Sequence, residues 1–115
     1  MTNNSKYLVA ALMGVALVAA GCSSLKTPAT ADVAVSKAAV ENAAGDGGAA
    51  YAPVEMLAAR EKLALANKAM AAKDYKLAID MAAQAQVDAK LAKSKANSAK
   101  AQTAADALQD DLSLA

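Results

Sequence analysis

The second half of the chain places a small apolar residue at every third or fourth position, with polar residues between them. This alternating spacing keeps one face of an α-helix apolar. Asp74 is a suitable N-cap for such a helix, which we predict to span residues 75–109. The positions on its apolar face are Tyr75, Ala78, Ala82, Ala85, Ala89, Ala92, Ala96 and Ala99.

A second helix is predicted just before it, over residues 53–72. Pro53 fits the first helical position, and Glu55 suits the positive end of the helix dipole. The short connection to the next helix favours an antiparallel hairpin. Because the connection contains neither glycine nor proline, one continuous helix is the alternative. The apolar face of the predicted helix carries Met56, Ala59, Leu63, Ala66 and Met70.

The residues before Pro53 predict a shorter helix and a linker. The helix covers residues 32–44, and its weak periodicity means that it needs packing to be stable. Gly45 to Gly48 should end it in a turn. Residues 22–31 are small and polar, which is typical of a flexible tether. The expected fold is all-α: a small helical bundle over residues 32–112, with an antiparallel hairpin of two long helices and a shorter N-terminal helix.

The N-terminal segment has a different character. The apolar run from Tyr7 to Gly21 would span only about 22 Å as a helix, less than the ~30 Å of a bilayer core. It ends in Ala-Ala-Gly and is followed by Cys22, the only cysteine. This arrangement resembles the lipobox of a bacterial lipoprotein signal peptide. An ordinary secretory signal and a retained membrane helix are the alternatives, but neither accounts for a cysteine at this place.

The lipobox resemblance implies a processed and lipid-modified chain. Residues 1–21 would be a cleaved signal peptide, and the Cys22 thiol would carry a diacylglycerol. One fatty chain binds a membrane only marginally, whereas the two or three of a lipoprotein hold it firmly. The next residue is Ser23 and not aspartate, which by the sorting rule of enteric bacteria implies transfer to the outer membrane. We therefore expect a lipid-anchored protein on the periplasmic face of that membrane.

Composition narrows the classes of function. The chain has no histidine, and its one cysteine is assigned to the lipid, so neither a Ser/His/Asp triad nor a metal-ligand cluster is present. We expect no enzyme activity, no metal, no cofactor and no small-molecule substrate. Once Lys6 is removed with residues 1–21, 11 basic residues balance 11 acidic ones. This balance gives no support for binding nucleic acid, which calls for a basic face.

Charges are nevertheless separated along the last predicted helix. The simplest interpretation is a solvated helix face, and contact with anionic lipid or an acidic partner is the alternative. The charged residues are Lys90, Lys93, Lys95 and Lys100, followed by Asp106, Asp110 and Asp111.

The predicted hairpin has arms of unequal length. The second arm should extend well beyond the first, and its apolar positions there shift to Ala101, Ala105, Leu108 and Leu112. An apolar stripe without a covering helix is an interaction surface in a soluble domain. The alternatives are that the first helix covers this stripe, or that the C-terminal end frays because Asp110 and Asp111 are unfavourable near a helix C-terminus.

Residues 52–92 are similar to the alanine-rich bacterial lipoproteins of domain-of-unknown-function family 4398. Members of that family are typically envelope lipoproteins, and it has no assigned activity. The resemblance therefore implies a location but no chemistry. The residues that carry it are Ala52-Pro53-Val54-Glu55, Ala59-Arg60-Glu61-Lys62-Leu63, Lys73-Asp74-Tyr75, Ala78, Ala82, Ala85, Asp88-Ala89 and Leu91-Ala92.

These features together predict a structural or adaptor lipoprotein. Its helices would contact an envelope protein or a second copy of the chain, and acyl chains on Cys22 would hold it in the membrane. The alternative is a regulatory binding protein, such as an inhibitor or helper of a periplasmic enzyme or secretion complex.

Overall fold

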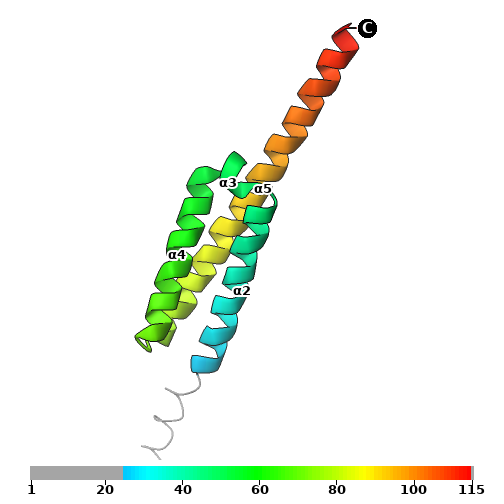
Figure 1. Cartoon of the computed structure of the whole chain (residues 1–115). Helices are drawn as coiled ribbons and strands as arrows, with labels where there is room; N and C mark the ends of the chain where they lie inside the picture. The colour runs from blue at the N-terminus through cyan, green and yellow to red at the C-terminus, as the bar shows by residue number, and fades with distance from the viewer. Residues whose placement is uncertain (1–24, 115) are drawn as a thin grey trace, which may run out of the picture.

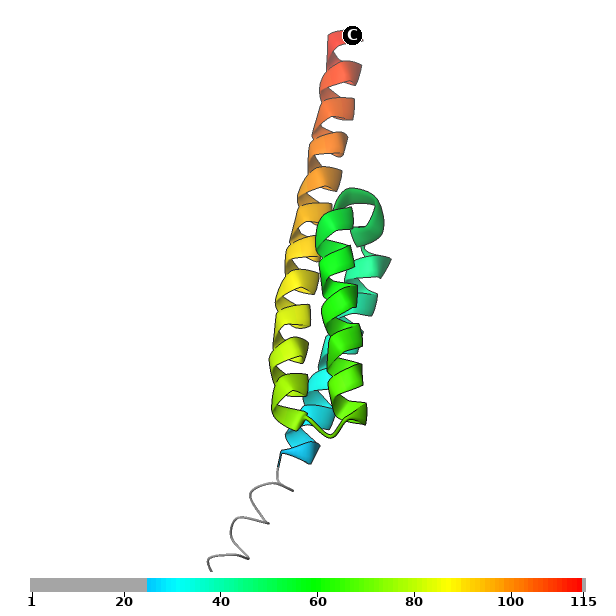
Figure 2. The same cartoon turned by 90° about the vertical axis from the view of Figure 1, so that its left-hand side faces the viewer.

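The structure, a computed structural model, describes residues 25–114. Four helices make up this part of the chain. They are α2 (Lys26–Gly45), α3 (Gly48–Tyr51), α4 (Pro53–Ala71) and α5 (Tyr75–Leu114). Helices α2, α4 and α5 lie side by side, and α4 runs antiparallel to the other two (Figures 1 and 2). The all-α prediction is confirmed, with a hairpin between α4 and α5.

The turn between α4 and α5 is a tight C-cap followed directly by an N-cap. Lys73 has a positive φ of 61°, and its N–H donates to the Met70 carbonyl at 3.0 Å. The Asp74 N–H donates to the Ala69 carbonyl at 2.9 Å, which completes a Schellman motif. The Asp74 carboxylate then accepts from the Leu77 N–H at 3.3 Å, as the sequence predicted. These bonds make a continuous α4–α5 helix impossible.

Replacing Lys73 by glycine is expected to stabilise the hairpin. A side chain in the left-handed region costs about 1–2 kcal/mol, and glycine loses part of this advantage through unfolded-state entropy. We expect a net gain of about 0.5–1 kcal/mol in the free energy of unfolding, measured by urea denaturation. Lys37→Gly, within α2 and also exposed, should lose about 1 kcal/mol. Equal losses in both variants would contradict this account of the turn.

The interior of the bundle consists almost wholly of alanine. Among the described residues, Val40 and Met56 are the only buried apolar side chains that are not alanine. The predicted face of α5 is confirmed, because its alanines from Ala78 to Ala96 are buried and Tyr75 and Ala99 are partly buried. Small side chains let the helices approach closely, but each buries little apolar area.

Helix α2 is longer than predicted, and the predicted tether is wrong for residues 26–31. The helix begins at Lys26, so it is slightly longer than α4 and not the shorter helix that we expected. Pro28 is tolerated because it lies in the first turn, where its missing N–H has no helical partner. Ala29 is fully buried in a cluster with Ala69 and Ala78. This tertiary contact draws the segment into the bundle.

The predicted turn after α2 is present but contains a short helix. Gly47 has a φ of 92°, which favours glycine. Gly48 begins α3, and a Cβ atom there would lie 2.6 Å from the Met56 Sδ and 2.7 Å from the Ala43 carbonyl oxygen. Only glycine therefore lets the chain pass this closely over the end of the core.

A buried hydroxyl fixes α2 against α5. The Ser36 Oγ lies 2.7 Å from the Ala82 carbonyl oxygen and 2.8 Å from that of Asp32. A hydroxyl has one proton to donate, so the two carbonyls share it. This contact sets the position of α2 along the alanine face of α5.

Candidate functional site

The C-terminal part of α5 projects beyond the bundle. Residues 101–114 are all exposed, and we call this segment the overhang (Figures 1 and 2). The bundle ends at Lys100, whose ammonium donates to the Asp46 carbonyl and lies 5.9 Å from the centre of the Tyr51 ring. The helix continues to Leu114, beyond the predicted end at residue 109.

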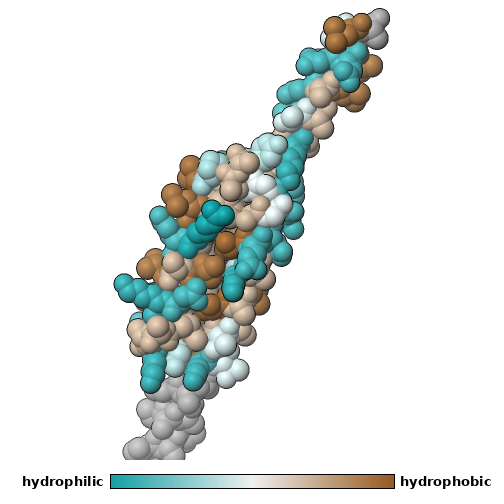
Figure 3. Space-filling model, in the orientation of Figure 1, coloured by the Kyte–Doolittle hydropathy of each residue, from teal (hydrophilic) through white to brown (hydrophobic). Residues whose placement is uncertain are grey.

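The predicted interaction residues all lie on the overhang. At about 100° per residue, Ala101, Ala105, Leu108 and Leu112 fall within an arc of roughly 60°. Leu108 is 62% exposed and Leu112 is 70% exposed, and apolar surface is visible near the tip in Figure 3. The alternative that the first helix covers this stripe is wrong, because α2 ends at Gly45 beside Lys100.

Lysines of α5 bind the residues that follow α2 and the first turn of α4, at the end of the bundle nearest the overhang. The Lys93 ammonium lies 3.5 Å from the Asp46 carboxylate, and Lys100 contacts the carbonyl of the same residue. Lys95 pairs with Glu55 of α4 at 2.6 Å. Within residues 25–114, Lys90 makes no ion pair. Most of the basic stretch therefore has a local structural role, and Lys90 stands apart from it.

Two ion pairs link α4 to α5. The hydrogen bond from the Lys95 ammonium, aided by a backbone N–H, holds the pKa of Glu55 below its usual value. Because the folded-state pKa is lowered, this pair adds stability above the ordinary pKa, and the stability is lost as the pH falls through the lowered pKa. Lys62 pairs with Asp88 at 2.5 Å. These carboxylates serve the packing of the hairpin.

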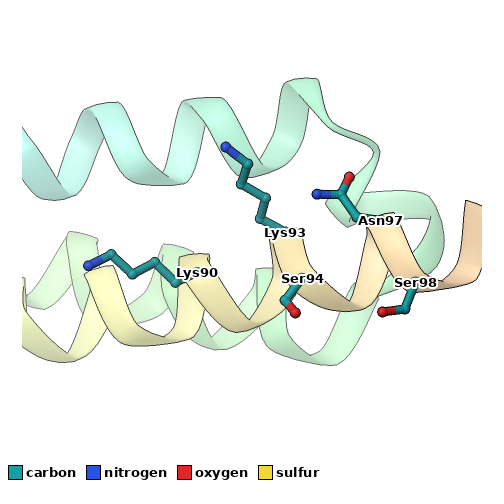
Figure 4. Close-up of a pocket in the computed structure, with 5 residues that line it drawn as sticks. All are labelled: Lys90, Lys93, Ser94, Asn97 and Ser98. Atoms are coloured by element: carbon teal, nitrogen blue, oxygen red, sulfur yellow. The ribbon is translucent and has the colours of Figure 1, made fainter.

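The described residues offer little that could enclose a ligand. They contain no group of three or more His, Cys, Asp or Glu side chains that could hold a metal ion. One open hollow of about 340 Å³ is lined by Lys90, Lys93, Ser94, Asn97 and Ser98, all from α5 (Figure 4). A hollow whose walls come from a single helix lies on a convex surface. It suits contact with another surface better than capture of a small molecule.

The predicted lipid attachment at Cys22, the signal peptide and residues 22–24 of the predicted tether lie outside the described residues. Across residues 25–114, no helix is both long enough and apolar enough to cross a membrane.

Comparison with protein families identifies the family of this chain. The family described as "Domain of unknown function (DUF4398)" matches residues 31–108. The chain belongs to this family. The family resemblance predicted from residues 52–92 is thus confirmed, and the DUF4398 match also takes in most of α2 and the first half of the overhang. Neither a search of curated proteins nor a search of solved structures gave a match.

Two exposed apolar residues of this DUF4398 chain were not among the predicted interaction residues. Val87 is 65% exposed and Leu91 is 51% exposed, and both lie on α5 within the bundle region. Their spacing of four residues indicates one face of the helix, but Ser94 and Ser98, which follow at the next positions of that face, interrupt the apolar pattern. The candidate surface on α5 is therefore longer than the overhang alone.

Proposed function

We propose that this protein is a lipoprotein of the bacterial outer membrane that acts without catalysis. It is anchored through acyl chains on Cys22 and faces the periplasm. Its helical bundle serves as a structural or adaptor module, and helix α5 makes the contact with its partner.

The lipobox supports the anchor. The apolar run, the small residues before Cys22 and the single cysteine are explained together by acylation. A lipid on this cysteine would place the N-terminal end of α2 near the membrane. The mature chain needs no membrane-spanning segment for such attachment.

The exposed leucines of the overhang are the observation that carries the adaptor role. Leu108 and Leu112 present their side chains to solvent on a helix that has no neighbour in this region of the described chain. Burial of one leucine contributes about 1.5–3 kcal/mol, so the stripe gains most when another helix or surface covers it. The chain thus has an apolar surface suited to binding a protein.

Crosslinking in cells tests this proposal. A photoreactive amino acid at position 108 is expected to link the chain to a protein of the envelope. The variant Leu108→Lys with Leu112→Lys should reduce capture of the same partner through position 105 at least tenfold, because each buried leucine is worth about a factor of ten in affinity.

Thr103→Lys with Ala107→Lys is the matched control. It adds the same two charges to exposed positions on roughly the opposite side of the overhang, and capture should remain. Links to a second copy or to wall-associated proteins support the structural role. Links to one recurrent periplasmic enzyme would replace it with the regulatory role, and the absence of any protein link would overturn the proposed contact.

A further inference from the structure

Helix α5 carries a second stripe in addition to its buried alanine face. Starting at Val87, eight exposed residues follow one another at alternating intervals of four and three. This is the spacing of a coiled-coil seam. We call these residues the outer stripe: Val87, Leu91, Ser94, Ser98, Ala101, Ala105, Leu108 and Leu112.

The outer stripe lies roughly opposite the alanine face of α5. At about 100° per residue, its centre is about 170° around the helix from the line of Ala78 and Ala96. Figure 4 shows Ser94 and Ser98 on the side of α5 away from α2, whereas Lys93 extends toward α2. The stripe spans 26 residues, or about 39 Å of helix. Its Val87 end lines a shallow hollow together with Lys62 of α4, and its other end lies on the overhang, beyond the end of the bundle.

We propose that the occupant of the outer stripe is the same stripe of a second copy, packed antiparallel about a two-fold axis. The order of residue sizes is symmetric, with large residues at both ends and small ones in the middle. In the antiparallel register, Val87 of one copy faces position 112 of the other, and Leu91 faces position 108. Ser94 faces position 105, and Ser98 faces position 101. Each large side chain then meets a large one, and the small central residues let the helices approach closely.

The distribution of charge selects the antiparallel direction. The basic residues from Lys90 to Lys100 occupy the first half of the stripe, and the acidic residues from Asp106 to Asp111 occupy the second half. A parallel pair would place like charges side by side, which is destabilising. The antiparallel pair places Lys90 beside position 111 of the other copy, on the same flank of the seam. Lys90 is the one lysine of this stretch whose ammonium has neither an ion pair nor a hydrogen bond within the described residues.

The symmetry of this dimer is closed, because the outer stripe of each copy covers that of the other and neither stripe remains free to bind a third copy. Each overhang would lie on the outer face of α5 of the other copy, and the two bundles would lie on opposite sides of the seam. This inference rests on the proposed function in one respect, because both assign helix α5 to protein contact. It adds the identity of the partner and the direction of the contact.

Site-directed crosslinking of full-length protein in cells tests the register. Two differently tagged copies are co-expressed, one with Leu91→Cys and the other with Leu108→Cys, and are treated with a short thiol-to-thiol crosslinker. We expect a product that contains both tags, at least tenfold above the Leu57→Cys and Leu108→Cys pair. Leu57 is 59% exposed but lies on α4. The parent chain, with Cys22 alone, gives the background.

Charge exchange gives a second measurement. Asp111→Lys should reduce the crosslinked product several-fold, and adding Lys90→Asp in the same chain should restore it. Failure of this rescue would overturn the register. A strong product of Leu108→Cys with itself would overturn the antiparallel direction. A Leu108→Cys link to a different envelope protein, without a link between copies, would overturn the dimer and leave the proposed function intact.

Discussion

Replacing Cys22 by alanine is expected to abolish fatty-acid labelling of the protein and to remove it from the outer-membrane fraction. The thiol is the group that would carry the lipid, and alanine cannot replace it. Each buried methylene contributes about 0.8 kcal/mol to membrane binding, so the loss of two or three acyl chains removes the whole anchor. Labelling with a radioactive or clickable fatty acid, followed by membrane fractionation, measures both effects.

Ser23→Asp is the informative control for this experiment. It keeps Cys22, so labelling should continue, while the sorting rule that favours the outer membrane for Ser23 should now retain the protein at the inner one. Unchanged outer-membrane fractionation of the Cys22→Ala variant would refute the anchor. Outer-membrane fractionation of Ser23→Asp, with fatty-acid labelling retained, would refute the sorting assignment alone.

Replacing Ala85 by leucine is expected to cause a large loss of stability. Ala85 is fully buried, and the closely spaced helices leave no room for three more carbon atoms. Overpacking of a core typically costs about 1–3 kcal/mol, which lowers the midpoint of thermal unfolding by roughly 5–20 °C in a domain of this size. The helical circular dichroism signal of the purified protein, followed during heating, measures this change.

Ala83→Leu provides the comparison for this substitution. Ala83 lies two positions away on the same helix and is exposed, so its change should stay within about 0.5 kcal/mol. Equal midpoints for the two variants would mean that the alanine face of α5 is not closely packed.

The sequence predicted the hairpin well because local rules determine it. The three-and-four spacing of alanines located the buried face of α5, and Asp74 located its start. Pro53 located the start of α4. Each of these signals acts within a few residues, and α5 is long enough for its periodicity to be clear.

Features that depend on distant contacts could not be predicted in the same way. The segment before Asp32 has the composition of a linker, and it becomes helical because Ala29 meets Ala69 and Ala78. Similarly, the partners of Lys93 and Lys100 depend on where the α2–α4 connection falls along α5.

The candidate surface was predicted in part. Ala101, Ala105, Leu108 and Leu112 were recognised because leucines mark the end of the stripe. The half from Val87 to Ser98 was missed, since serines at seam positions resemble an ordinary polar surface. The folded chain shows that the residues of both halves are exposed, so the two halves form one continuous stripe.

If Cys22 carries the lipid, as proposed, the early start of α2 limits how far the bundle can stand from the membrane. Three positions of the sequence lie between Cys22 and Lys26, the first residue of α2, so the two Cα atoms can be at most about 14 Å apart. In the proposed antiparallel pair, the two anchored ends lie about 65 Å apart along the seam. Both can reach one bilayer only if the pair lies flat along it. The assembly would then lie parallel to the membrane surface, attached by lipids at both of its ends, and would not project toward the cell wall.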